Sequence, residues 1–328
     1  MKKLMIGNQA VAEGLHDGGL GVVSSYPGTP STEITEFLSK FDDIHSEWAP
    51  NEKVACEVAF GSSLAGARSA CAMKHVGLNV AADPLFTLSY TGVNGGMVIC
   101  VADDPAMHSS QNEQDSRHYA IGAKVPMLEP ADSQESYDFA KKAFELSEKY
   151  DTPVILRTTT KLAHSQSAVE LCERVEVADK EYVRTPTKYV MMPASAIARH
   201  VVVEKRESAL REFAENTTLN TVEDNGAKIG VITEGIAYMY AKEALGDKAD
   251  FLKLGMVYPL PEKKIIDFAK KYDKVYVIEE LEPFMEEQIK AAGIKCIGKE
   301  LIRGIEHICV RSQFIANGCL ILIFRTGR

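Results

Sequence analysis

Two hydrophobic spacings alternate along the first half of the chain. Short apolar runs, typical of buried strands, are separated by longer segments in which apolar side chains recur every three or four positions, as on one face of a helix. The predicted strands are residues 22–26, 44–48, 70–74, 97–104, 125–128 and 153–157. The predicted helices are residues 1–18, 31–38, 51–67, 85–95 and 133–150. This alternation predicts an α/β fold with a parallel sheet covered on both faces.

The same alternation returns in the second half of the chain. The predicted strands there are residues 229–232, 251–254 and 275–279, and the predicted helices are residues 237–245, 261–271 and 284–292. The segment between the two halves is more charged and less regular, which indicates a linker with an exposed helix. We therefore expect a first domain over residues 1–165, a linker over 166–226, a second parallel-sheet α/β domain over 227–300 and an atypical tail over 301–328.

The ends of four predicted strands are of chemical interest, because ligands of open parallel sheets bind at the carboxyl edge. Tyr26, Lys74, Asp103 and Arg157 occupy such ends. The first domain therefore has a candidate ligand edge.

Composition removes several classes of function. The formal charge of −9 disfavours a nucleic-acid partner, which requires clustered Lys and Arg. The longest apolar run, residues 314–324, is about half the length that spans a bilayer, and we interpret it as a buried strand or a sticky end. The seven cysteines form no C-x-x-C pair, which argues against a zinc site or an iron–sulfur cluster held by this chain alone. An odd cysteine count and no secretory leader predict a reducing, cytoplasmic compartment, and we expect no metal site on this chain.

The helix predicted after Asn51 carries the strongest chemical signal. Glu52 opens it, and small side chains follow at Ala55, Ala59 and Ala65. An acid at a helix start is often only a favourable partner of the helix dipole. The alternative is a buried carboxyl group that shares a proton with the ring nitrogen of a heterocyclic cofactor.

Several motifs resemble one protein family. The turn Tyr26-Pro27-Gly28-Thr29-Pro30-Ser31 is similar to the Tyr-Pro-x-Thr-Pro-Ser turn of the thiamine diphosphate-dependent 2-oxoacid:ferredoxin oxidoreductases. Glu52 precedes Gly61 by nine positions, which resembles the pyrimidine-binding domain of thiamine diphosphate enzymes. Four further segments resemble the indolepyruvate ferredoxin oxidoreductase alpha subunits in particular, and these are residues 51–55, 73–79, 109–117 and 156–160. The resemblance covers roughly residues 1–300.

The resemblance implies a pyrimidine-binding domain followed by a transketolase C-terminal-like domain, and it assigns roles to individual residues. Glu52 would be the catalytic glutamate that activates the cofactor, and Thr29 and Pro30 would lie at the substrate carboxylate. Residues that would contact thiamine diphosphate are Pro27, Gly28, Thr29, Glu52, Lys74, His75 and Gly77, with residues 74–77 as a loop near the pyrimidine.

Three alternatives accompany this assignment. His75 is equally consistent with a plain surface histidine, and Glu57 is an alternative acid that does not fit the spacing. The polar run from Gln111 to Arg117 is either part of the site or only a charged loop.

The implied activity is the oxidative decarboxylation of aryl pyruvates to aryl-acetyl-CoA with reduction of ferredoxin. The implied partners are a beta (gamma-type) subunit, a diphosphate-binding and ferredoxin-like portion, ferredoxin and CoA. This chain departs from the family because it lacks the Gly-Asp-Gly stretch that holds magnesium and the closely spaced cysteines of a 4Fe–4S cluster. We expect both groups on a missing portion or on a partner, and the isolated chain to be inactive. The alternatives are a truncated, non-catalytic assembly module and a split-subunit thiamine diphosphate 2-oxoacid decarboxylase.

Overall fold

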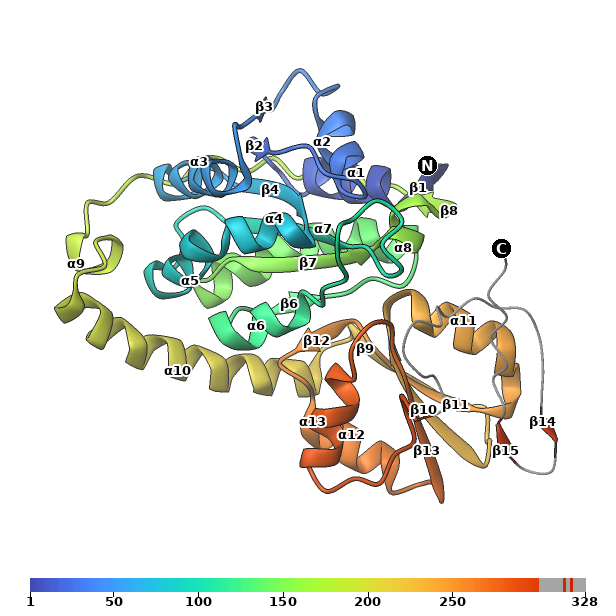
Figure 1. The fold of residues 1–328 in the computed structure, drawn as a ribbon. Helices are drawn as coiled ribbons and strands as arrows, with labels where there is room; N and C mark the ends of the chain where they lie inside the picture. Colours follow the sequence, from blue (N-terminus) through green and yellow to red (C-terminus); the bar gives the residue numbers. More distant parts are fainter. Residues whose placement is uncertain (301–314, 317–318, 321–328) are drawn as a thin grey trace.

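Two β-sheets organise the computed structural model, which describes residues 1–300, 315–316 and 319–320 (Figure 1). The larger sheet has seven strands in the order β12-β6-β7-β5-β4-β2-β3, and the smaller has four in the order β13-β10-β11-β9. We refer to the elements around the larger sheet as the first unit and to those around the smaller sheet as the second unit. The second unit lies beside the β12–β6 edge of the larger sheet (Figure 1).

The larger sheet is parallel except for one edge strand. Its parallel strands are β2 (Val22–Ser25), β3 (His45–Trp48), β4 (Ser69–Lys74), β5 (Met97–Asp103), β6 (Met127–Leu128) and β7 (Val154–Thr159). Every residue of β4, β5 and β7 is buried. Such continuously buried strands are typical of a parallel sheet with helices on both faces, as the sequence predicts.

Helices cover the two faces of this sheet in two groups. One core contains side chains of α1 (Gly7–Asp17), α2 (Thr32–Leu38), α7 (Ser133–Tyr150) and α10 (Pro193–Asn216). The other contains side chains of α3 (Glu52–Ala65), α4 (His75–Val80), α5 (Ala82–Thr91) and α6 (Arg117–Ala123). Helix α7 spans the predicted residues 133–150, because the Asp132 side chain accepts a hydrogen bond from the Glu135 amide at its start (2.8 Å) and Asp151 takes a left-handed conformation at its end.

The expected helix over residues 1–18 is wrong at its start. Residues Lys2–Ile6 form strand β1, which pairs antiparallel with β8 (Gln166–Glu170), so that Leu4 faces Ala168. Helix α1 begins only at Gly7. A two-stranded ribbon of this kind depends on a partner far along the chain, and the local pattern of apolar residues carries no record of it.

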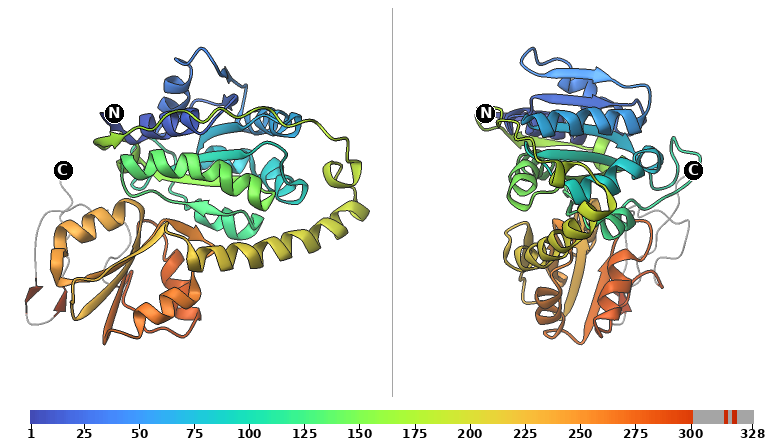
Figure 2. Two further views of the ribbon diagram at one scale, coloured as in Figure 1. Left: turned by 180° about the vertical axis from the view of Figure 1, so that it is seen from behind. Right: turned by 90° about the vertical axis from the view of Figure 1, so that its left-hand side faces the viewer.

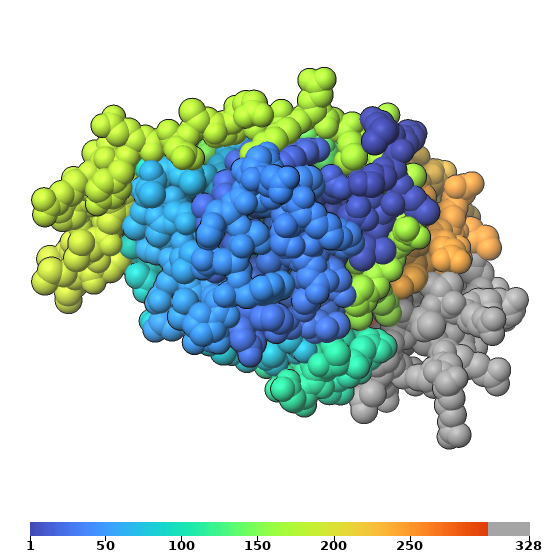
Figure 3. All heavy atoms as spheres, turned by 90° about the horizontal axis from the view of Figure 1, so that it is seen from above, coloured from blue at the N-terminus to red at the C-terminus, as the bar shows by residue number. Residues whose placement is uncertain are grey.

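The segment after β8 follows the surface of the first unit before it reaches the second. The Val175 amide donates to the Asp17 carbonyl (2.8 Å), and the Lys180 amide donates to the Gly66 carbonyl (3.0 Å). Figure 3 shows this yellow-green segment along one side of the first unit. It continues through α9 (Pro186–Tyr189) into the long helix α10, which runs toward the second unit (Figure 2). The linker helix is therefore present, but Val203, Arg206, Leu210 and Ala214 are buried.

The second unit is a smaller α/β sheet. Its parallel strands are β10 (Ile229–Glu234), β11 (Asp250–Leu254) and β13 (Lys274–Ile278), and β9 (Asn220–Glu223) joins β11 antiparallel. Helix α11 (Gly235–Leu245) packs on one face, and helices α12 (Glu262–Ala269) and α13 (Phe284–Ala291) pack on the other. The remaining elements are α8 (Thr160–His164) and η1 (Gly246–Lys248).

Strand β12 (Met256–Tyr258) belongs by sequence to the expected second domain, residues 227–300, but it lies in the sheet of the first. Although it follows β11 in the chain, it pairs antiparallel with β6 and forms the edge of the larger sheet. Met256 joins one core of the first unit, and Val257 and Tyr258 join the other. A division of the chain by sequence position alone therefore does not separate the two sheets.

Most of the tail lies outside the described residues, including most of the apolar run 314–324. Two short strands are described within it, β14 (Ile315–Ala316) and β15 (Cys319–Leu320), and they pair antiparallel with each other.

Candidate functional site

The carboxyl ends of neighbouring strands gather the predicted site residues at one edge of the larger sheet. Ser25 at the end of β2 lies opposite Trp48 at the end of β3, and the Ala49 amide donates to the Ser25 carbonyl (2.8 Å). The chain leaves β2 into the Tyr26–Pro30 turn and leaves β3 into the start of α3 at Glu52. Parallel pairing therefore places the turn and the acid beside each other, as the strand order requires.

Hydrogen bonds fix the turn between β2 and α2. The Gly28 amide donates to Thr32 Oγ1 (2.9 Å), and the Gly28 carbonyl accepts from the Ser31 amide (2.8 Å) and the Ser31 hydroxyl (2.7 Å). From helix α1, Asn8 Nδ2 donates to the Pro30 carbonyl (2.7 Å). The Thr29–Pro30 peptide bond is cis. The turn is held by its own residues and by a buried side chain from a neighbouring helix.

Glu52 is the first residue of α3, and its side chain turns inward. The Asn51 side chain caps the helix by accepting a hydrogen bond from the Val54 amide (2.9 Å). Glu52 is only 8% exposed, and within the described part of the chain no hydrogen bond or ion pair reaches its carboxylate. The alternative acid Glu57 lies on the outer surface of the same helix, near Lys53. The two acids therefore differ in environment, with Glu52 buried and Glu57 exposed.

Gly77 lies against the Glu52 carboxyl group. A Cβ atom added to Gly77 would lie 2.6 Å from Glu52 Oε1 and 2.7 Å from its Cγ. Residues 75–77 form the first turn of α4, so the expectation of a loop at residues 74–77 is wrong. Strand β4 passes directly into this helix, and Leu78 anchors the helix in the core of the first unit.

Lys74 closes the space between the turn and the next loop. Its aliphatic chain lies beside Gly28, where an added Cβ would be 3.2 Å from Lys74 Cδ. Its ammonium group donates to the Ser109 carbonyl (3.0 Å), and burial lowers the pKa of Lys74 although nearby Asp104 opposes the shift.

His75 is fully buried, so the interpretation as a surface histidine is wrong. Its Nε2 lies 3.0 Å from the Asn112 carbonyl oxygen, and its Nδ1 has no partner within the described residues. A buried ring nitrogen without a partner is unusual in a protein interior and requires a physical explanation.

The loop between β5 and α6 covers this edge of the sheet. Asp104 organises it by accepting hydrogen bonds from the Ser109 amide (2.8 Å) and the Ser110 hydroxyl (2.7 Å). The Ser109 hydroxyl then donates to the Thr29 carbonyl (3.1 Å). Within the polar run 111–117, the Asn112 carbonyl contacts His75, which is one of the predicted site residues.

Sequence reasoning did not single out Asn8, Asp104 or Ser109. Asp104 and Ser109 belong to segments that the sequence marks, a strand end and the 109–117 motif. Asn8 carries no such signal, because its contact with the Pro30 carbonyl depends on the packing of α1 against α2.

Asp103 and Arg157, expected at the ligand edge, pair with each other instead. Arg157 Nε donates to Asp103 Oδ2 (2.8 Å), and both side chains are fully buried. Arg157 also pairs with Glu129 (2.5 Å). Both residues belong to a buried charged network with Glu129, and Asp103 also accepts from Ser116 at the end of the loop between β5 and α6. Among the described residues, neither side chain contacts Glu52 directly.

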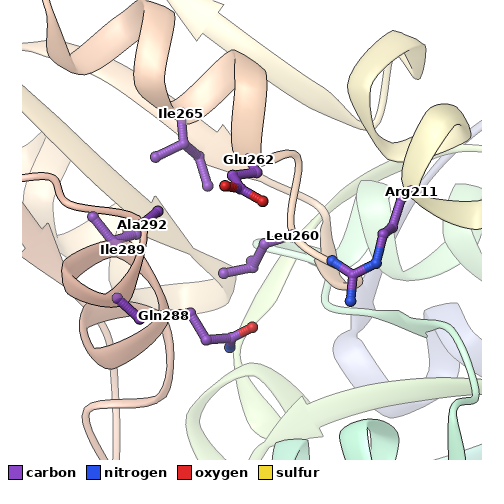
Figure 4. A pocket seen from close by; sticks show the side chains of 8 residues that line it. Arg211, Leu260, Glu262, Ile265, Gln288, Ile289 and Ala292 are labelled. Atoms are coloured by element: carbon purple, nitrogen blue, oxygen red, sulfur yellow. The ribbon is translucent and has the colours of Figure 1, made fainter. Parts of the chain in front are cut away.

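A separate shallow groove lies in the second unit. It has a volume of about 300 Å³ and is lined by Leu260, Ile265 and Ile289, with Arg211 of α10 at its rim (Figure 4). It contains none of the predicted site residues. Within the described residues, no helix is long and apolar enough to cross a bilayer. In the same residues, no three His, Cys, Asp or Glu side chains are grouped so as to bind a metal ion.

Glu52 and His75 each present a polar group without a hydrogen-bond partner within the described residues, and Gly77 places no side chain against the Glu52 carboxyl group. A carboxyl group and an imidazole nitrogen can both exchange hydrogen bonds with a polar ligand.

Comparison with known proteins agrees with this geometry. The family described as "Pyruvate flavodoxin/ferredoxin oxidoreductase, thiamine diP-bdg" matches residues 13–228. The indolepyruvate oxidoreductase subunit IorA of Archaeoglobus fulgidus is 44% identical over 306 residues, covering 89% of this chain and 49% of the relative. The subunit of the same name from Pyrococcus horikoshii is 42% identical over 330 residues, covering 94% and 51%. The chain therefore spans about half the length of these relatives.

A solved structure shows the same fold. The 2-oxoglutarate:ferredoxin oxidoreductase from Magnetococcus marinus superposes with a TM-score of 0.76 at 20% identity, covering 90% of this chain and 61% of that one. The α/β architecture expected from the sequence is thus confirmed.

Proposed function

Because this chain belongs to the thiamine diphosphate-binding family of pyruvate flavodoxin/ferredoxin oxidoreductases, we propose that it supplies the pyrimidine side of a thiamine diphosphate site in an indolepyruvate-type 2-oxoacid oxidoreductase. The whole enzyme would decarboxylate aryl pyruvates oxidatively to aryl-acetyl-CoA and pass the electrons to ferredoxin. The observation that carries the proposal is the Glu52 side chain, which opens α3, is only 8% exposed and has no hydrogen-bond or ion-pair partner among the described residues.

Glu52 would hold a proton at the pyrimidine ring. A carboxyl group in a site of low dielectric forms a strong hydrogen bond when it shares a proton with a ring nitrogen. Bound there, thiamine diphosphate would supply the electron sink for decarboxylation of a 2-oxoacid. The first turn of α4, with Gly77 against the acid, fixes where that proton is held.

The other predicted residues would surround this position. Pro27, Gly28 and Thr29 would line the cofactor from the turn after β2, with Lys74 behind Gly28. His75 would offer its free Nδ1 to the same ligand. Thr29 and Pro30 would face the substrate carboxylate, and hydrogen bonds from Ser109 and Asn8 to their carbonyl groups hold this part of the turn.

The remaining components would lie on another portion or a partner. We propose that a diphosphate-binding and ferredoxin-like portion holds the Mg²⁺ and the 4Fe–4S cluster, and that a beta (gamma-type) subunit completes the enzyme with CoA and ferredoxin. One fact supports this division: the chain spans about half the length of the IorA relatives.

The test compares two acids on one helix. The chain is assembled with the diphosphate-binding portion and the beta subunit, and indolepyruvate- and CoA-dependent viologen reduction is measured beside thiamine diphosphate binding by calorimetry. Glu52→Gln should lower turnover by about 100-fold or more while the thermal melt of the chain is kept. The matched control is Glu57→Gln, an exposed acid of the same helix, which should leave turnover unchanged.

Three results would reject the proposal. Near-normal turnover of Glu52→Gln would remove the role given to that acid. Wild-type binding of the partners without any turnover would favour a non-catalytic assembly module, and release of carbon dioxide without electron transfer would favour a decarboxylase.

A further inference from the structure

Arg117 lies at the centre of the interface between the two units. It is the first residue of α6, and its side chain is fully buried. Its NH1 pairs with Glu279 (2.7 Å) and with Glu234, and its NH2 donates to the carbonyl oxygens of Glu280 (2.8 Å) and Glu282 (3.0 Å). All of these acceptors come from the carboxyl ends of β10 and β13. The Arg117 side chain of the first unit therefore binds the carboxyl edge of the sheet in the second unit.

The same guanidinium group holds the end of the loop that covers the candidate site. Arg117 Nε donates to Asp115 Oδ1 (2.9 Å), and its NH2 donates to Asp115 Oδ2 (2.5 Å). The Glu282 amide of the second unit approaches the same Asp115 oxygen (3.3 Å). Asp115 is thus bound from both units at once, and a shift of the second unit acts on it through two contacts.

The following residue ties the loop back to the sheet. The Ser116 amide (3.0 Å) and hydroxyl (2.5 Å) both donate to Asp103 at the end of β5. Asp103 also accepts from the buried Arg157. The carboxyl end of the loop is therefore clamped by charged groups that are all buried.

The middle of the loop contacts the Glu52 site at three places. The Ser109 hydroxyl donates to the Thr29 carbonyl, the Ser109 carbonyl accepts from Lys74, and the Asn112 carbonyl lies at His75. Each contact uses a residue between Asp104 and Asp115, the two acids that fix the loop. The position of Asp115 consequently bears on the positions of Thr29, Lys74 and His75.

The charge balance makes Arg117 hard to replace. Asp115, Glu234 and Glu279 are all buried around it, and burial raises the pKa of both glutamates. Removing one member of a buried ionic group leaves another charge without compensation. The network therefore keeps its geometry only while the second unit remains packed against the first.

We propose that Arg117 is a positioning residue that couples the position of the second unit to the position of the loop over the Glu52 site. It touches neither cofactor nor substrate, and it acts through Asp115. This inference depends on the proposed function in one respect, namely that the site covered by the loop is the cofactor site. The coupling itself is a property of this chain, and thiamine diphosphate is not needed to measure it.

The test places the substitution in the second unit and reads the response in the first. Hydrogen exchange of the full chain without cofactor is followed by mass spectrometry for wild type and Glu279→Gln. The substitution keeps the size of a side chain that contacts Arg117 but not the loop. Peptides from residues 104–116 should exchange about tenfold faster, while β4 peptides keep their protection.

A matched control shows whether any buried acid of the second unit has this effect. Glu286 is also buried, but it pairs with Lys290 (2.5 Å) and accepts from the Lys299 amide (2.7 Å), without contact to Arg117. Glu286→Gln should leave the loop peptides at wild-type exchange. Equal acceleration in both variants would reduce the effect to general loosening and overturn the proposal.

A second variant keeps the test informative if Glu279→Gln does not fold. Arg117→Lys keeps the positive charge but loses the forked donors, so it should accelerate exchange in the same loop peptides. In the assembled enzyme, the same variant should raise the thiamine diphosphate concentration needed for half-saturation about tenfold. Loop exchange at the wild-type rate in Arg117→Lys would overturn the proposal, whatever the outcome of the Glu52→Gln assay.

Discussion

Gly77 and the Glu52 carboxyl group lie in direct contact, although one belongs to α4 and the other to α3. A Cβ atom on residue 77 would approach Glu52 Oε1 to 2.6 Å, which real Cβ atoms do not tolerate. The backbone of Gly77 does not require a left-handed conformation, so the glycine is needed for space. The first turn of α4 therefore limits the orientations open to the Glu52 carboxyl group.

We therefore expect Gly77→Ala to impair the cofactor site more than the fold. The methyl group should push the carboxylate aside and raise the dissociation constant for thiamine diphosphate in the assembled enzyme about tenfold or more, since a misplaced group loses much of its interaction. Overpacking should also cost about 1–3 kcal/mol of stability. Calorimetric titration and chemical denaturation measure the two effects.

Gly61→Ala is the matched control for that substitution. Gly61 lies in α3, and nothing lies within 4 Å of an added Cβ. In the isolated chain the change should raise stability by up to about 1 kcal/mol, because alanine favours a helix over glycine. Wild-type cofactor binding by Gly77→Ala would contradict the role given to Gly77 in orienting the Glu52 carboxyl group.

The cap of α3 gives a second prediction. Because Asn51 accepts the Val54 amide, Asn51→Ala should lower the free energy of unfolding by about 1 kcal/mol. Fraying would begin at Glu52, the first helical residue, so cofactor affinity should fall with stability. Asn51→Asp keeps an accepting oxygen and should restore both quantities. Loss of stability in Asn51→Asp equal to that in Asn51→Ala would show that the cap does not operate.

Asp104 gives a prediction for the dependence of stability on pH. Burial raises its pKa, but hydrogen bonds from Thr160, Ser109 and Ser110 outweigh that effect, and the net pKa lies below the ordinary value of 3.8. A carboxyl group whose pKa is depressed in the fold stabilises it above the ordinary pKa, and this contribution is lost as the pH falls through the folded value. Wild type should therefore lose the Asp104 contribution below about pH 4.

The measurement is the difference in melting temperature between wild type and Asp104→Asn at several pH values. The difference should be constant from pH 7 to 5 and should narrow below about pH 4, where wild type approaches the variant. Asp83→Asn serves as the control, since Asp83 is an exposed acid paired with Lys53, and its difference should stay small throughout. A difference for Asp104→Asn that does not change with pH would contradict the argument.

Sequence patterns were sufficient where the determinants are local. Helix α7 has a clear period and a cap at Asp132, and its bounds follow from them. Glu52 and the Thr29 turn follow from a motif whose spacing reflects neighbouring strand ends. Strands β1 and β12 were missed because each depends on a partner distant in the chain, and pairing leaves no local trace.

The same reasoning explains what was missed at the site. The sequence places Asp103 at a strand end, which is correct, but β7 continues past Arg157 to Thr159, and the pattern does not show that the two buried side chains pair with each other. Nor does it show that His75 is enclosed by the loop that carries Asn112. Contacts between segments brought together by the fold require the structure.

Strand β12 has a practical meaning for anyone who wishes to shorten this protein. A fragment ending at residue 165 or 226 would lack Met256, Val257 and Tyr258, which seal the cores on both faces of the larger sheet. It would also leave β6 as an unpaired edge strand, whose backbone could form hydrogen bonds with strands of other chains. Such a fragment should precipitate on expression, whereas a soluble minimal form must continue through Tyr258.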